Sequence, residues 1–208
     1  MGDVMTVQGR GIAAGLAAAI GAVALAASAQ GTAEGARYTV DGKLEFPKDY
    51  RTWAYLTTGM DMSYVEGSGD PALHVLDNVF VDRAAFEAFQ KTGTWPDKTV
   101  MVLEARRAAQ KGSINKRGHF QTERLATEVH VKDLARFKDT GGWAFFGFGG
   151  SEQPAPMIPA KAGCIACHEA HGAVDTTFVQ FYPTLLPLAQ AKKTLSAAYL
   201  KDEAAAVR

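Results

Sequence analysis

Both cysteines of this 208-residue chain lie in one short motif in its last quarter, Cys164-Ile165-Ala166-Cys167-His168. The pattern C-x-x-C-H is typical of covalent haem attachment. Two intervening residues let both thiolates reach the two vinyl groups along one edge of a haem and form thioethers. His168 can then turn under the ring, so that an imidazole nitrogen meets the iron. The motif therefore predicts haem c held by Cys164 and Cys167, with His168 as the proximal metal ligand.

Two other uses of the cysteine pair stay open from the sequence. A redox dithiol or disulfide of the thioredoxin type is expected early in a βαβ unit, whereas this pair lies late and follows Pro154, Pro156 and Pro159. A zinc site needs two further ligands at suitable spacing, and the sequence offers only scattered histidines. The complete motif favours haem over both.

The first 29 residues have the pattern of a secretory signal peptide. Arg10 precedes a run over residues 11–27 that contains only Gly, Ala, Ile, Leu and Val, and Ala27-Ser28-Ala29 supplies small residues for cleavage. An uncleaved membrane anchor is the alternative, but the run is rich in Ala and Gly and falls short of about 20 strongly apolar residues. We expect cleavage near Ala29, a periplasmic location and no membrane attachment of the mature chain.

Charge and composition limit what the chain can bind and how it is organised. The 22 Lys and Arg residues balance the 22 Asp and Glu residues, which argues against a nucleic-acid partner. With 47% hydrophobic residues, the chain can bury a core. We expect a flexible lead-in over residues 30–40, one folded domain over residues 41–191, and a helical or disordered tail over residues 192–208.

Five segments have the length and the β-branched or aromatic character of strands: 52–58, 74–81, 99–105, 127–131 and 143–148. Side chains alternate along a strand, so Met101 and Leu103 share one face of the third segment, and Val100 and Val102 share the other. Both faces are apolar, which predicts a central strand.

Helices and a charged connection are expected between these strands. Asp82 can cap a helix that ends at Gly93, and a second short helix is expected to begin near Lys132. Segment 104–124 holds six basic and two acidic residues. We expect it to be a solvated hairpin connection, with a docking patch for an acidic partner as the alternative.

Beyond the motif, seven segments follow one another in a characteristic order: Leu44 to Arg51 followed by Trp53, Asn78 to Asp82, Phe89 to Asp97, Thr99 to Val102, Gly142 to Phe145, Cys164 to His168, and Phe178 to Leu185. In this order and spacing the chain resembles the cytochrome P460 family, which includes the cytochromes c′-beta, over roughly residues 41–190. The resemblance implies an α+β fold, an antiparallel β-sheet with flanking helices, in which haem is bound between the sheet and the C-x-x-C-H segment. It also implies a homodimer.

The resemblance has a second implication, which concerns the far side of the haem. In the hydroxylamine-oxidising members a strand lysine is bonded to the haem ring, and its position aligns with Leu103. The chain is therefore more similar to the lysine-free cytochromes c′-beta, which implies a five-coordinate haem that binds nitric oxide under an apolar distal cap. Leu103 and Phe80 are the residues expected to form this cap. An apolar pocket offers few hydrogen bonds to water or anions, so it favours a small, weakly polar ligand.

Two other functions remain open. Glu128 aligns with a distal proton acceptor of the catalytic members, so oxidation of hydroxylamine or a related nitrogen compound, or weak peroxidase activity, is the first alternative. An exposed strand charge is the other interpretation of Glu128. If Met101 or Met157 closes the sixth coordination site, the chain is an electron-transfer cytochrome with a partner cytochrome. Both methionines are otherwise ordinary core or loop residues, and His171 is expected at the surface.

Overall fold

In a computed structural model of the chain, residues 1–2, 35–64, 70 and 72–206 are described. The expected signal peptide, apart from its first two residues, lies outside them. The described residues from Gly35 onward belong to one compact unit. Among these residues, no helix has the length and hydropathy needed to cross a bilayer.

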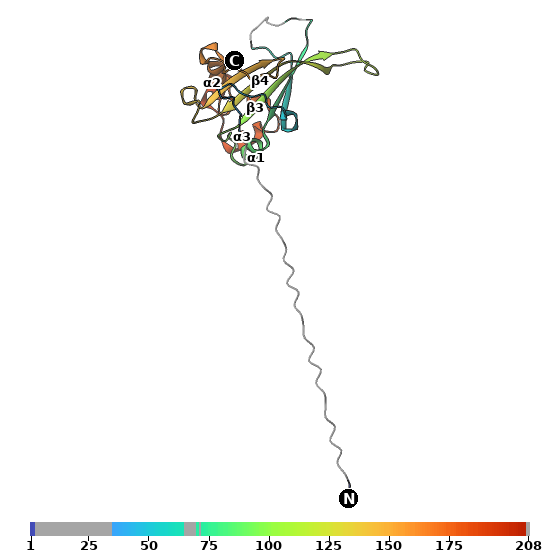
Figure 1. Cartoon of the computed structure of the whole chain (residues 1–208), viewed down its shortest axis with the longest axis vertical. Helices are drawn as coiled ribbons and strands as arrows, with labels where there is room; N and C mark the ends of the chain where they lie inside the picture. The colour runs from blue at the N-terminus through green and yellow to red at the C-terminus, as the bar shows by residue number, and fades with distance from the viewer. Residues whose placement is uncertain (3–34, 65–69, 71, 207–208) are drawn as a thin grey trace. The chain divides into compact units, whose positions relative to one another are not determined.

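A five-stranded antiparallel sheet forms the centre of the fold (Figure 1). Its strands lie side by side in chain order: β1 (Ala54–Met60), β2 (Val75–Val81), β3 (Val100–Ala109), β4 (Phe120–Lys132) and β5 (Trp143–Gly149). Antiparallel neighbours need only local connections, which suits this simple order. The expected α+β class is confirmed, and β3 is the central strand, as predicted.

Helices flank the sheet: α1 (Arg83–Thr92), α2 (Cys164–His171), α3 (Leu186–Lys192) and α4 (Ala197–Ala206). Short 3-10 helices occur at Tyr50–Thr52, Lys138–Thr140, Ala160–Ala162 and Val179–Phe181. The prediction for α1 is confirmed at both ends, because the Asp82 carboxylate accepts a bond from the Ala85 N–H and Gly93 takes a left-handed φ of 78°.

The prediction of a helix near Lys132 is wrong. β4 continues to Lys132, whose backbone N–H donates to the Thr99 carbonyl. The Asp133 carboxylate then accepts bonds from the N–H groups of Ala135 and Arg136. An aspartate that bonds its own following backbone closes a turn, so the chain turns here before the 3-10 helix at Lys138–Thr140.

The two faces of β3 contact two different cores, as side-chain alternation requires. Met101 belongs to one core, in which Leu56, Val81, Phe89, Trp95 and Leu185 are also buried. Val100 and Val102 belong to the other, together with Leu44, Phe46, Tyr50, Phe80, Val129 and Phe146. Residues 100, 101 and 102 of β3 therefore contact one core or the other according to their position on the strand.

The second core contains a fully buried carboxylate, Glu104. It accepts hydrogen bonds from the Tyr50 hydroxyl at 2.7 Å and from Arg51 at 2.6 Å, and it pairs with Arg106 at 2.7 Å. Burial alone would raise the pKa of Glu104, but the bonds from Arg106, Tyr50 and Arg51 hold it below its ordinary value. This ionised network fastens the 3-10 helix at Tyr50–Thr52 to the centre of the sheet.

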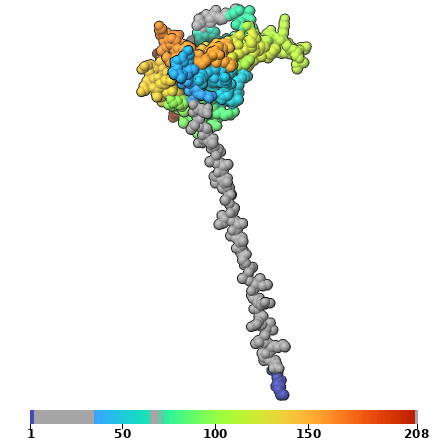
Figure 2. Space-filling view, in the orientation of Figure 1, coloured from blue at the N-terminus to red at the C-terminus, as the bar shows by residue number. Residues whose placement is uncertain are grey.

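β3 and β4 continue beyond the predicted segments into a hairpin that projects from the rest of the sheet (Figures 1 and 2). Three of the six basic residues of segment 104–124 are paired with acids: Arg106 with Glu104, Arg107 with Glu123, and Arg124 with Glu152. These pairs lie along the strands. Lys111, Lys116 and Arg117 are exposed in the connection between the strands.

Both described ends of the compact unit are attached to it. Tyr38 forms a bridge with Leu44, and the Arg136 guanidinium lies 3.9 Å from the centre of the Tyr38 ring. At the other end, Tyr199 of α4 is buried, and Asp202 pairs with His171 of α2 at 2.8 Å. Part of the expected lead-in is therefore packed on the domain, and the tail is helical over α4.

Candidate haem site

The C-x-x-C-H motif forms the start of α2, and its histidine lines a cavity of about 350 Å³. All five strands contribute to one side of this cavity, and His168 and residues of segment 177–182 contribute to the other. The volume lies in the range of small-molecule and cofactor sites. The motif and the sheet thus enclose a space of suitable size for part of a prosthetic group.

The His168 ring is held in one orientation. Its Nδ1 lies 2.7 Å from the Thr176 carbonyl oxygen, and its face stacks on Phe178 with ring centres 4.2 Å apart. A carbonyl oxygen can only accept a hydrogen bond, so Nδ1 carries the proton and Nε2 is left for a metal. Burial lowers the pKa of His168, although the bond to Thr176 opposes this. The neutral imidazole is the form that binds metals.

The loop that supplies the Thr176 carbonyl is fixed from several directions. Asp175 and Thr176 have left-handed φ angles of 48° and 61°, which are uncommon for residues with side chains. The Trp95 ring N–H donates to the Thr177 hydroxyl at 2.8 Å, and the Trp95 backbone N–H donates to the Asp175 carboxylate at 3.0 Å. The buried Lys132 ammonium donates to the Trp95 carbonyl at 2.7 Å. This network ties the orientation of His168 to the sheet.

The two cysteines are accessible at the start of α2. Both thiols are free and partly exposed. At positions i and i+3 of α2 they lie on one side of the helix. The pKa of Tyr64, which lines the cavity, is raised by burial, then by Asp77 and by Cys167, whereas neither cysteine is itself among the described residues of the lining.

The donor set suits a haem iron better than a bare metal ion. The described residues contain no group of three or more His, Cys, Asp or Glu side chains that could hold a metal ion. A porphyrin supplies four ligands itself, so a single axial histidine beside two thiols is sufficient. The chemistry of these residues therefore fits haem c.

Leu103 and Glu128, which the sequence singled out, both line the cavity. They are cross-strand partners in the pairing of β3 with β4. Met101 lines the same cavity and is buried, whereas Met157 lies outside its lining and is 44% exposed. Glu128 is exposed, so it faces the cavity and solvent together. Lys and Arg are absent from the described lining.

Phe80, in contrast, does not line the cavity, which corrects the expectation that it caps the haem. Phe80 pairs with Val102 and shares its face, with its ring 5.6 Å from that of Tyr50 in the second core. The preceding residue, Val79, pairs with Leu103 and lines the cavity. A shift of one residue along a strand moves a side chain to the other face of the sheet.

His130 is a cavity residue that the sequence did not single out. It is 8% exposed and stacks on Phe145, with ring centres 3.9 Å apart, and its ring lies 5.1 Å from that of His168. Burial holds the pKa of His130 well below its usual range. Its Nε2 is buried without a hydrogen-bond partner among the described residues. Its position two residues after Glu128, on the same strand face, is the sequence signal for it.

Asp77 is the other cavity residue without a prediction from the sequence. It lies on β2 two residues before Val79, and therefore on the same face. Burial raises the pKa of Asp77, and the charges of Glu128 and Asp61 raise it further. The cavity thus contains two carboxylates, Asp77 and Glu128, that interact electrostatically.

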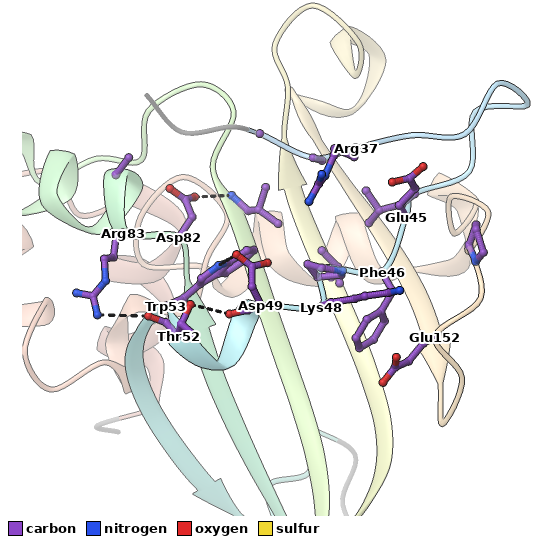
Figure 3. A pocket seen from close by; sticks show the side chains of 18 of the residues that line it. Arg37, Glu45, Phe46, Lys48, Asp49, Thr52, Trp53, Asp82, Arg83 and Glu152 are labelled. Atoms are coloured by element: carbon purple, nitrogen blue, oxygen red, sulfur yellow. Dashed lines mark hydrogen bonds between the residues drawn. The ribbon is translucent and has the colours of Figure 1, made fainter. Parts of the chain in front are cut away.

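A larger cleft of about 740 Å³ lies elsewhere in the domain (Figure 3). Charged residues such as Arg37, Lys48 and Glu152 line it, together with Phe46 and Trp53. It contains neither the cysteines nor His168. The smaller cavity is therefore the candidate site.

A comparison with known protein families found a match. A family model described as Cytochrome P460 matches residues 47–179. The matched stretch includes all five strands, the C-x-x-C-H motif and the loop that carries Thr176. No curated protein matches the chain.

Proposed function

The chain belongs to the cytochrome P460 family, and we propose that it is an exported mono-haem cytochrome c with an open distal site that binds nitric oxide. The observation that carries the proposal is the pairing of two features in one cavity. His168 is oriented by the Thr176 carbonyl for axial ligation, and the lining has Leu103, with no lysine, on the central strand. A bound haem would supply an iron that can take a small ligand.

Three residues would hold the group. Cys164 and Cys167 would form the thioethers, and the Nε2 of His168 would be the proximal donor. The bond from Nδ1 to Thr176 keeps the ring from rotating and increases the basicity of the ligating nitrogen. This bond would therefore influence how strongly His168 binds the iron.

The apolar part of the lining determines which ligands are favoured. Val79, Met101, Leu103 and Phe145 present hydrocarbon, thioether and ring surfaces to the cavity. Water and anions would lose hydrogen bonds on entering such a space, whereas a weakly polar diatomic molecule would lose little. This difference supports nitric oxide as the ligand.

Glu128 supports a second candidate, oxidation of hydroxylamine or a related nitrogen compound. Its carboxylate belongs to the cavity lining, opposite Leu103 in the strand pairing. A carboxylate within reach of a bound nitrogen compound can accept its protons as electrons leave it. Exposure keeps this base solvated, so we rank this activity second.

The test is spectroscopic and kinetic. Absorption and resonance Raman spectra of the purified holoprotein should show a five-coordinate, high-spin ferrous haem that binds nitric oxide, with slow or no hydroxylamine turnover in the presence of an artificial electron acceptor. A six-coordinate, low-spin spectrum in both oxidation states would contradict the proposal. Rapid turnover that Glu128→Gln abolishes would establish the second candidate. Glu123→Gln, on the same strand but outside the cavity lining, is the control.

Attachment and export are tested separately. The denatured protein should keep its haem absorbance through acid-acetone extraction and should carry the added mass of one haem. N-terminal sequencing of the secreted form should begin near Gln30. Haem that is lost on extraction would contradict thioether attachment.

A further inference from the structure

We infer that Asp77 is a specificity-determining residue that, together with Glu128, makes the cavity select ligands by charge. The cavity would admit neutral molecules and small protonated amines and would keep anions such as azide and nitrite from the iron. This inference rests on the proposed open haem site. Asp77 was not among the residues predicted from the sequence.

The sheet places the two carboxylates on either side of one strand. Asp77 on β2 pairs with Ala105 of β3, and Glu128 on β4 pairs with Leu103 of β3. Ala105 and Leu103 are two residues apart and share a face, so both acids project from the same side of the sheet. All four residues line the cavity. Between the acids, β3 offers only a methyl group and a leucine side chain.

Neither carboxylate has a cation to balance it. Within the part of the chain that the structure describes, no hydrogen bond or ion pair involves the side chain of Asp77 or Glu128, and no Lys or Arg lines the cavity. Glu104, on the opposite face of β3, has Tyr50, Arg51 and Arg106 around its carboxylate. The fold thus neutralises the acid on one face of β3 and leaves those on the other face unpaired.

The two carboxylates interact with each other within one cavity. The pKa of Asp77 is raised first by burial, then by the negative charge of Glu128 and by that of Asp61, which follows β1. Tyr64 lines the same cavity, and its pKa is raised by burial and then by the charge of Asp77. Removing a half-buried carboxylate from water is unfavourable unless a partner compensates for the loss. A cationic or hydrogen-bond-donating ligand would supply that partner.

Charge selection follows from Coulomb's law. An anion that enters the cavity approaches two negative groups in a partly desolvated space, where repulsion is stronger than in water. Nitric oxide carries no charge and is not repelled. Protonated hydroxylamine would be attracted and would find proton acceptors in the cavity lining. His130 adds a buried Nε2 without a partner among the described residues as a further polar contact for such a ligand.

The experiment compares anion and nitric oxide binding by the holoprotein. Azide and nitrite are titrated into the ferric form, and nitric oxide into the ferrous form, for the wild type, Asp77→Asn, Glu128→Gln and the double variant. We expect Asp77→Asn to raise azide affinity about tenfold and the double variant to raise it further. Nitric oxide affinity should change less than about twofold. Asp139→Asn, which removes an exposed charge outside the cavity lining, should match the wild type.

Three results would overturn the inference. Unchanged azide affinity in Asp77→Asn, in a wild type that binds nitric oxide, would remove the role of Asp77 and leave the proposed function intact. An equal rise in the affinities for azide and nitric oxide would show that the substitution changes access to the cavity and not its charge selectivity. A wild type that is six-coordinate and low-spin would overturn the proposed function and this inference together, and the wild-type spectrum alone would reveal it. Asp77→Glu keeps the charge and should retain the low anion affinity, which separates charge from folding defects.

Discussion

The Nδ1 of His168 lies 2.7 Å from the backbone carbonyl oxygen of Thr176, eight residues further along the chain. This bond joins the haem motif to a loop that Trp95 and Lys132 hold against the sheet. His168, the proposed proximal ligand, is therefore positioned by residues far from it in sequence, through a backbone atom that no side-chain substitution removes. The geometry of this hydrogen bond can still be changed by a substitution at a residue that packs between His168 and the loop.

Gly172 is the position that tests this relationship. A Cβ atom at Gly172 would lie 2.6 Å from the His168 carbonyl oxygen and 2.7 Å from the Thr176 carbonyl carbon, so Gly172→Ala must displace the loop. We expect a loss of about 1–3 kcal/mol in the free energy of unfolding and an altered iron–histidine stretching frequency in the ferrous protein. Thermal unfolding and resonance Raman spectroscopy measure these. Gly150→Ala, whose Cβ would meet only an atom 3.7 Å away, is the control and should leave both unchanged.

The haem should be bonded to the cysteines alone. Leu103 stands on β3 in the cavity lining, and that lining contains no lysine among the described residues. Lys98, just before β3, is ion-paired with Asp133 at 2.6 Å. Peptide mapping of the digested holoprotein should find the haem only on the peptide that contains Cys164 and Cys167. A haem peptide that also contains a lysine cross-link would refute this expectation.

Met101 tests whether a methionine closes the sixth position. It is buried in the cavity lining, so it is better placed for ligation than the exposed Met157. With an open site, Met101→Leu should leave the coordination markers of the resonance Raman spectrum unchanged, since this exchange nearly conserves volume. Met157→Leu is the matched control. A change from low-spin to high-spin iron in Met101→Leu alone would identify an electron-transfer cytochrome instead.

Glu104→Gln should destabilise the fold, and the effect should depend on pH. Removing the charge leaves Arg106 partly buried without its anion, and we expect a loss of about 2–4 kcal/mol near neutral pH. The pKa of Glu104 is lowered in the folded state, so its contribution is present above the unfolded pKa of about 4.3 and is lost as pH falls through the folded pKa.

Urea unfolding at a series of pH values measures this dependence. The difference between wild type and Glu104→Gln should be largest near neutral pH and should shrink in acid. Glu123→Gln, which removes an exposed partner of Arg107, should show a much smaller dependence, because solvent screens this ion pair. A difference that grows as pH falls would contradict the ionised network.

Local features could be predicted from the sequence, whereas the register between strands could not. The haem motif, the helix from Asp82 to Gly93 and the central strand could be predicted because each depends on local spacing. Phe80 was misplaced, since deciding between Val79 and Phe80 requires knowing which of them faces Leu103 across the sheet. That pairing depends on the whole of β2 and β3, and a shift of one residue reverses it.

Asp77 and the Thr176 carbonyl could not be predicted for a related reason. Asp77 belongs to the site only because Ala105 aligns it with Leu103 and Glu128. Thr176 contributes a backbone oxygen, which every residue type carries, so its role cannot be recognised from the sequence. The turn after Lys132 depends on Asp133 bonding its own following backbone, an interaction that competes with helix formation at short range.

The division of β3 between two interiors has a consequence for how such a protein can change over time. Positions 101, 103 and 105 shape the ligand cavity, while positions 100, 102 and 104 contribute to the core around Glu104. Exchanges at the first set can alter chemistry without disturbing the contacts that the second set makes. Related proteins with this fold can therefore differ in reactivity through the cavity positions of β3, while the core positions of the same strand preserve the fold.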